Sequence, residues 1–322
     1  MAIPIKKFGQ YVKVQIHSED GQLVFETDSL KIDFDVRNKA GWERGKFTIT
    51  NLNPDTIRKI SDANNANYIT IWTALHDSKL SLLVNNMYIS NALEEINVPN
   101  SIFSIYGYSK LRKEFLEKQI DIQVLSPSLA EMVGKAISAS GFKGELEFKF
   151  FPEEKLFHTP TNPKARLQGS LLSVLEVLGD QFNFNLYTEG ARIILMYKPV
   201  TEDVDKTTLL TGDADITLST DNMRSNPKIG PANLSIVSNL EPLIKPSSVL
   251  DISKLLTIGT DVPEETLKIT EDYLQKKIAG FSKYQVLSTQ HKGSNWSGDW
   301  STQAVALSPT KGTTMSSSKW WA

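Results

Sequence analysis

The strongest constraint on the fold is a strict alternation of apolar and polar side chains between residues 30 and 37. The apolar members are Leu30, Ile32, Phe34 and Val36, and the polar members are Lys31, Asp33, Asp35 and Arg37. Successive side chains of a strand point to opposite faces, so this pattern predicts a strand with one face in a core. Shorter alternating runs recur through residues 11–110 and 226–307. Many short strands at this spacing favour a barrel or sandwich.

The segment between these two β-rich regions has a different pattern. Apolar residues at helical spacing predict one helix that starts at Ser126-Pro127 and ends near Gly141, and a second helix over residues 171–178. Glu189-Gly190 then separates two strand-like runs and indicates a hairpin. Residues 201–212 are a polar linker in this interpretation. Asn53-Pro54 predicts a short helix start within the first β region.

Composition limits the function classes. The chain has 322 residues, of which 40% are hydrophobic and 22% are charged, the balance of a soluble globular protein. Cysteine is absent, which excludes disulfides and thiolate metal sites. The net charge of −2 predicts no long-range attraction to nucleic acid, and no apolar run is long enough to span a membrane.

Motifs for chemistry are sparse. Phosphate-binding glycine loops and the Gly-x-Ser-x-Gly nucleophile elbow do not occur, so no catalytic, cofactor-binding or metal-binding residue is predicted. No two of His17, His76, His158 and His291 are spaced to share a metal.

Two pairs of aspartates two residues apart are open to more than one interpretation. Asp33 with Asp35, and Asp213 with Asp215, could be an acid and base pair, but a solvated strand face is the favoured explanation. Four tryptophans could stack sugars, although core or subunit contacts are favoured. These are Trp42, Trp72, Trp296 and Trp300.

A resemblance to a known family rests on residues near both ends of the chain. The first set is Asn51, Leu52, Thr56 and Ile60. The second set is Leu240, Pro242, Ile244, Pro246, Ser247, Tyr284, Val286, His291, Gly293, Trp300, Ser301 and Thr302. In order and spacing these resemble the baseplate hub proteins of contractile-tailed bacteriophages. The chain departs from that pattern at residues 73–76 and 87–90, where the family has an Ala-Gly-Tyr turn and a Phe-x-Gly strand.

The resemblance implies an α+β, mainly β fold with two related tube-type barrels. The domains expected are a first barrel at 1–112, a small α+β domain at 113–205, and a second barrel at 206–307. The second barrel would carry a helical insert near 263–280, and residues 10–110 and 210–305 should superpose. For His291 it implies a turn-stabilising hydrogen bond.

The implied function is structural and not enzymatic. Such a hub is a homotrimer in the virion baseplate, assembled in the host cytoplasm. Its six barrels continue the hexameric tail tube and adapt it to the trimeric central spike. The implied partners are the tube protein and the spike protein, with a tape-measure protein as a further candidate. No sequence-specific nucleic-acid binding is implied. The alternative is a carbohydrate-binding or cell-wall-degrading tail protein.

Two sets of residues are expected to contact partners. The four aspartates Asp33, Asp35, Asp213 and Asp215 are candidates for the lumen wall, where an acidic face would not grip phosphate. Residues 308–322 are polar and predict a flexible arm without an element of its own. Lys319, Trp320 and Trp321 end that arm and are the candidate anchors in a neighbour, since tryptophan is enriched among interface hot spots. The alternative is an arm that folds back on its own subunit.

Overall fold

The computed structural model describes residues 9–39, 42–62, 66–75, 79–97, 100–125, 127–151, 164–189, 192–197, 214–229, 233–255, 283–307 and 313–316. The chain divides into two compact units, and each is described by itself. The first unit consists of Met1–Phe115, Asn239–Pro242 and Gln290–Thr302. The second unit consists of Leu116–Ser238, Leu243–Thr289 and Gln303–Ala322.

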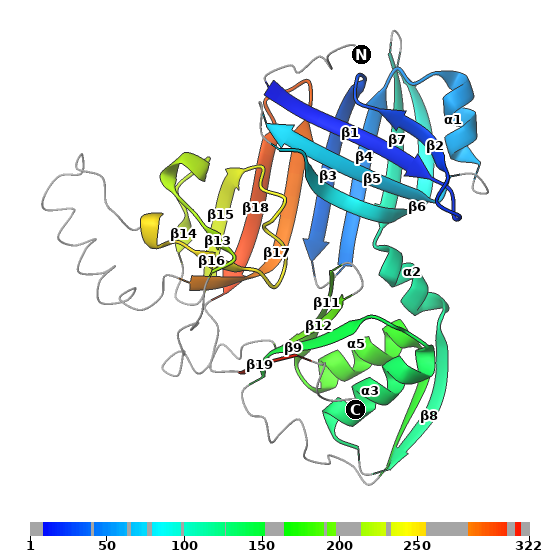
Figure 1. Ribbon diagram of the computed structural model, residues 1–322, viewed down its shortest axis with the longest axis vertical. Helices are drawn as coiled ribbons and strands as arrows, with labels where there is room; N and C mark the ends of the chain where they lie inside the picture. The colour runs from blue at the N-terminus through cyan, green and yellow to red at the C-terminus, as the bar shows by residue number, and fades with distance from the viewer. Residues whose placement is uncertain are drawn as a thin grey trace, which may run out of the picture. The chain divides into compact units, whose positions relative to one another are not determined.

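The first unit is built on a β-sheet (Figure 1). Its strands are β1 (Gln10–His17), β2 (Leu23–Thr27), β3 (Lys31–Lys39), β4 (Trp42–Thr50), β5 (Tyr68–Leu75), β6 (Ser81–Asn97) and β7 (Asn100–Tyr108). They follow the order β3-β4-β7-β6-β5-β1-β2, and each neighbouring pair is antiparallel. The end of β17 (Lys283–Ser294) adds to this sheet beside β3. The alternating residues from Lys31 to Arg37 therefore lie in a strand, β3, as predicted.

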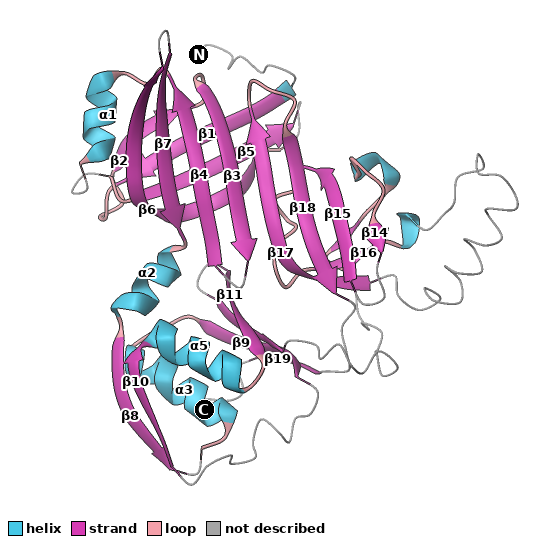
Figure 2. Cartoon of the chain, turned by 180° about the vertical axis from the view of Figure 1, so that it is seen from behind, coloured by secondary structure: helices cyan, strands magenta, loops and turns pink. Residues whose placement is uncertain are grey.

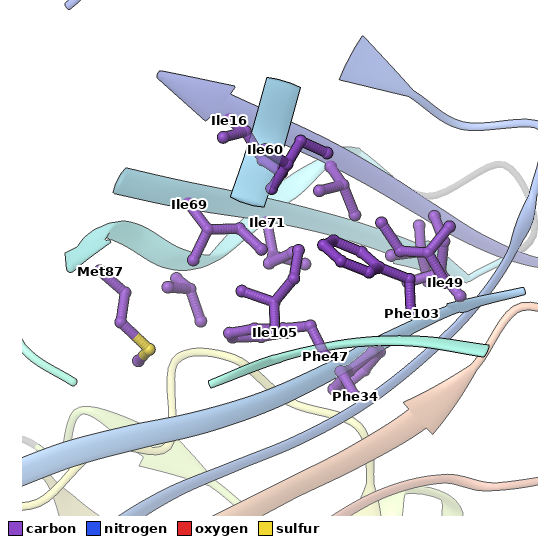
Figure 3. Close-up of a cluster of buried hydrophobic side chains, with 14 of the residues drawn as sticks. Ile16, Phe34, Phe47, Ile49, Ile60, Ile69, Ile71, Met87, Phe103 and Ile105 are labelled. Atoms are coloured by element: carbon purple, nitrogen blue, oxygen red, sulfur yellow. The ribbon is translucent and has the colours of Figure 1, made fainter. Parts of the chain in front are cut away.

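The core of the first unit gathers the inward side chains of these strands (Figure 3). Its labelled members are Ile16, Phe34, Phe47, Ile49, Ile60, Ile69, Ile71, Met87, Phe103 and Ile105. Trp300, far along the chain, belongs to the same cluster. Burial of these apolar surfaces is the main stabilising term for the unit.

Helix α1 (Pro54–Ser61) follows β4 and starts as the sequence predicts. Asn53 Oδ1 accepts a hydrogen bond from the backbone amide of Asp55 at 2.8 Å, and Pro54 occupies the first turn, where no amide donor is required. Ile57 and Ile60 are the buried residues of this helix. This part of the prediction is confirmed.

Helix α2 (Lys110–Glu117) is not predicted by the sequence analysis. Its basic residues lie over aromatic rings of the sheet: Lys110 Nζ is 5.0 Å from the ring centre of Tyr68, and Lys113 Nζ is 4.5 Å from that of Tyr88. Phe115 meets Trp42 edge-on at 6.1 Å. These tertiary contacts hold a short helix whose sequence is mostly charged and whose buried residues are Leu111 and Phe115.

The second unit contains an α+β portion (Figure 2). Its elements are β8 (Gln119–Leu125), α3 (Leu129–Ser140), β9 (Glu145–Phe151), β10 (Lys164–Ser170), α5 (Leu171–Gln181), β11 (Phe184–Glu189) and β12 (Arg192–Tyr197). Strand β8 pairs with β10, and β12 pairs with β11 and β9. Both predicted helices and the predicted hairpin are present. The cap of α3 is Ser128, whose hydroxyl accepts from the Glu131 amide, and not the predicted Ser126-Pro127.

The rest of the second unit is β-rich. Its strands are β13 (Ile216–Thr217), β14 (Lys228–Ile229), β15 (Asn233–Asn239), β16 (Val249–Asp251) and most of β17 and β18 (Trp300–Leu307). Single-turn 3-10 helices lie at Thr220–Asn222 and Ser253–Leu255. Leu234, Ile244, Tyr284 and Val286 are buried in its core. The α+β, mainly β fold class is confirmed.

The C-terminal region differs from the prediction at one place. Thr313–Ser316 form β19, which pairs antiparallel with β9. The polar sequence predicts no element there, because it offers little to bury, but the edge of β9 supplies backbone hydrogen-bond partners. The predicted helical insert near 263–280 lies outside the described residues.

Candidate functional site

The turn between β17 and β18 contacts β3 through Asn295, which lies between the family-like residues Gly293 and Trp300. The side chain of Asn295 makes two hydrogen bonds to the start of β3: its Nδ2 donates to Leu30 O at 2.7 Å, and its Oδ1 accepts from Ile32 N at 2.8 Å. Its backbone amide donates to Ile32 O at 3.2 Å. One buried amide side chain thus satisfies backbone groups at the edge of β3.

On the inward side of this junction, Gly293 lies between two aromatic rings. Phe34 and Trp300 meet edge to face, with ring centres 5.8 Å apart. A Cβ on Gly293 would lie 2.3 Å from Phe34 Cζ and 2.9 Å from Trp300 Cε3. Only glycine leaves room for the two rings to approach at this position.

His291 connects neighbouring strands. It is buried within β17, and its Nδ1 lies 2.9 Å from Thr302 Oγ1 in β18. The Thr302 hydroxyl also accepts from the backbone amide of Glu241 at 2.9 Å. Residue 291 lies inside a long strand, before the turn, so this contact joins two strands, and the turn-stabilising hydrogen bond stays a prediction.

The proline-rich part of the motif is divided between the two units: Leu240 packs against the core of the first unit, and Ile244 belongs to the core of the second. Ile244 is fully buried there. Ser247 follows Pro246 in a left-handed conformation, with φ of +76°, and its amide donates to Val286 O at 2.8 Å. This strained serine joins the motif to β17.

Asp33 and Asp35 point away from the core, on the outer face of β3, as the alternation predicts. Asp33 lies 3.6 Å from Lys31 Nζ. Asp35 accepts two hydrogen bonds from Arg37, at 3.1 and 2.8 Å, and one from Gln290 Nε2 at 2.7 Å. Both carboxylates are therefore paired with cations, and Asp35 also ties β17 to β3.

The environment of Asp35 shifts its acidity. Partial burial by itself would raise the pKa of Asp35, but the hydrogen bonds from Arg37 and Gln290 and the charges of Arg37 and Lys292 outweigh it and lower the pKa below its ordinary 3.8. A carboxylate with a depressed pKa contributes stability that is present above the unfolded-state pKa and is lost as the pH falls through the lower folded-state pKa.

We expect Asp35→Asn to lower the free energy of unfolding by about 1 kcal/mol at pH 7. The difference from the unsubstituted chain should shrink below about pH 4, where protonation of Asp35 removes its advantage. Urea unfolding at pH 7 and pH 3 measures this. Asp33→Asn, with one contact at 3.6 Å, is the matched control and should cost less at pH 7. An Asp35→Asn cost that grows toward pH 3 would contradict the assignment.

The other predicted site residues are dispersed or not described. Asp215 is exposed, and its Oδ2 accepts from the Val249 amide at 2.7 Å, so it joins two short strands of the second unit. Asp213 lies outside the described residues, as do Lys319, Trp320 and Trp321. The structure therefore does not bring the four aspartates together at one described site.

The four tryptophans have different environments. Trp42 and Trp300 are buried in strands, and Trp72 is half-buried in β5. Trp296, at the tip between β17 and β18, is 40% exposed. Two of the four rings considered for sugar stacking, Trp42 and Trp300, are therefore core residues.

Metal-binding clusters and helices able to cross a membrane are not found in the part of the chain that the structure describes. No group of three or more acidic or histidine side chains is arranged to hold a metal ion there. No described helix has the length and apolar character needed to cross a bilayer. Of the histidines, His76 and His158 lie outside the described residues.

Sequence reasoning missed several residues of the β17–β3 junction. Asn295 is surrounded by serine, glycine and tryptophan in a run typical of a solvated turn. Gln290 and Lys292 alternate with His291 and Gly293, and that alternation was the available signal for an outward face beside β3. The sequence does not show which distant strand they would meet.

Comparison with known proteins adds fold evidence. No protein-family model and no curated protein sequence matches the chain. The tail protein from Neisseria meningitidis MC58 matches with a TM-score of 0.52 at 11% identity, covering 94% of this chain and 97% of that one. The 43 kDa tail protein of prophage MuSo2 from Shewanella oneidensis gives 0.51 at 8% identity, covering 94% and 100%. The chain has the fold of these tail proteins.

This tail-protein fold also occurs within a larger chain. A Francisella PdpA-VgrG complex structure matches with a TM-score of 0.50 at 12% identity, covering 95% of this chain. The present chain spans about half of that one, 54%. At such identities the likeness is one of fold, and at that level the resemblance of the sequence to hub proteins is confirmed.

Proposed function

We propose that the chain is a structural protein of a phage tail and acts in the baseplate without catalysing a reaction. The observation that carries this is the fold match over nearly the whole chain to two tail proteins that are themselves covered almost completely. The buried glycine, histidine and tryptophan of the family-like motif support it, because all three join β17 and β18 to their surroundings.

The finer proposal is a homotrimeric hub. Each subunit contributes two barrels, so six barrels continue the hexameric tail tube and adapt it to a trimeric spike. The partners are then the tube protein, the spike protein and, in the lumen, a tape-measure protein. Asp33, Asp35, Asp213 and Asp215 are proposed for the lumen wall, and Lys319, Trp320 and Trp321 for contacts with a neighbour. Such a protein works in the virion after assembly in the host cytoplasm.

Assembly provides the test. An obligate ring interface buries about 2,000 Å² or more, so we expect light scattering to give three times the 36.0 kDa chain mass. Negative-stain images should show rings with a central hole. The measurement is made on the chain alone and after co-expression with the tube and spike proteins of the same tail. A chain truncated after Ser316 should still trimerise but should retain less spike protein.

Two outcomes would count against the hub. A strictly monomeric species in the presence of both partners would contradict the trimer. Release of soluble fragments from purified peptidoglycan by the chain alone would favour the alternative, a cell-wall-degrading tail protein. Full retention of the spike by the truncated chain would remove only the proposed role of Trp320 and Trp321.

A further inference from the structure

The outer face of β3, β4 and the end of β17 carries an excess of positive charge. Four cations, here called the basic strip, lie around the carboxylate of Asp35, while Asp33, on the same face of β3, is paired with Lys31. They are Arg37, Arg44, Lys46 and Lys292. The net charge of the whole chain is −2, so the positive charge of the strip is opposite in sign to the net charge.

The register of β3 and β4 places like charges together. Arg37 lies directly opposite Arg44, and Lys46 lies opposite Asp35. Arg37, Arg44 and Lys46 are all exposed. Like charges directly opposite on neighbouring strands are destabilising, so this arrangement costs the isolated fold stability. An anion bound to Arg44 would offset this cost.

Both carboxylates on this face of β3 already have a cationic partner, Lys31 for Asp33 and Arg37 for Asp35. Asp35 bonds twice to Arg37 and once to Gln290, and Lys292 Nζ lies 4.0 Å from it. Among the described residues, no carboxylate forms an ion pair with Arg44 or Lys46. Lys46 Nζ instead lies 5.6 Å from the ring centre of Tyr106 on β7. Two cations of the strip are therefore available to a ligand.

The spacing of the strip fits a chain of repeated negative charges. Arg44 and Lys46 are two residues apart on one strand, about 7 Å, and Arg37 is one strand away, about 5 Å. Guanidinium groups match phosphate oxygens in a planar, bidentate manner. Tyr106 adds an aromatic surface beside Lys46, a combination found where proteins follow a nucleic-acid strand.

We propose that the basic strip binds the phosphate backbone of a nucleic acid without reading its bases. The contact lies within the first unit of one chain and does not depend on the proposed trimer. It also modifies the expectation for this face, since Asp33 and Asp35 do not make it acidic. An acidic polypeptide is the competing ligand class, but its carboxylates would not need the paired arginines or the neighbouring ring.

The test measures fluorescence anisotropy of labelled DNA of about 20 nucleotides, single-stranded and duplex, across a salt series. The variant combines Arg44→Ala with Lys46→Ala. We expect its affinity at low salt to fall about tenfold or more, and the slope of log affinity against log salt to fall by about 2, one per lost phosphate contact. The two DNA arms show which form of nucleic acid the strip prefers.

The control combines Arg58→Ala with Lys59→Ala on α1, which removes the same net charge from exposed positions on a helix. This control should retain the affinity of the unsubstituted chain. Equal losses in both variants, no loss in either, or tighter binding of labelled polyglutamate than of DNA would overturn the proposal. As a fold check, Arg44→Ala alone should leave the unfolding midpoint unchanged or slightly raised, because it removes the opposed arginine pair.

Discussion

Trp300→Ala is expected to destabilise the first unit by about 3–5 kcal/mol, the range for removing a fully buried large aromatic side chain. Trp300 is 3% exposed, belongs to the core that Figure 3 shows in part, and meets Phe34 edge to face. Its loss therefore leaves a cavity and removes an aromatic pair worth about 1 kcal/mol. Urea unfolding followed by far-UV circular dichroism measures the change without relying on tryptophan fluorescence.

The same turn provides a matched control. Trp296→Ala removes an identical side chain four positions earlier, but that ring is 40% exposed, so the cost should stay below about 1 kcal/mol. Hydrogen exchange at the Ile32 amide gives a local readout, because this amide donates to Asn295 in the same turn. Equal costs for the two substitutions, or unchanged exchange at Ile32 in Trp300→Ala, would contradict the packing described for the junction.

Gly293→Val is expected to cost about 3 kcal/mol, at the upper end for overpacking a well-filled core. A Cβ at this position already lies within 3 Å of both Phe34 and Trp300, and the branched side chain adds two further methyl groups. Neither ring can move aside freely, because each is buried. Chemical denaturation again measures the change.

Two further variants separate overpacking from other effects. Gly298→Val lies in the same turn with nothing within 4 Å of the added Cβ, and should be nearly neutral. Phe34→Ala should reduce the cost of Gly293→Val, because it vacates the space that the valine needs. Costs that simply add in the double variant would mean that the clash with Phe34 is not the cause.

Local sequence patterns predicted much of the fold, for reasons that the structure makes clear. The order of neighbouring side chains is enough to predict three features. They are the two faces of β3, the start of α1 at Asn53, and the two buried helices of the second unit. Each of these depends on interactions within a few residues or on a simple periodicity. Such features can be predicted without knowing the partner strand.

The elements that were not predicted depend on distant partners. Helix α2 is held by rings from β4, β5 and β6, and β19 by the edge of β9. Asn295 bonds to residues more than 260 positions away. A solvent-exposed polar turn and a polar turn whose buried side chain bonds to a neighbouring strand have the same composition. Composition therefore does not distinguish them. The excess charge on β3 and β4 likewise appears only once their register is known.

The late position of the β17–β18 turn in the sequence has a consequence for synthesis on the ribosome. Residues Gln290–Thr302 complete a unit whose other strands end at Tyr108, and Gln290 bonds to Asp35 across 255 positions. Translation proceeds at about 5–20 residues per second, so the nascent β3 waits roughly ten seconds or more for its neighbour. During that interval its edge carries unpaired backbone groups that can pair with another chain. This edge of β3 is therefore where pairing with another chain would start during translation.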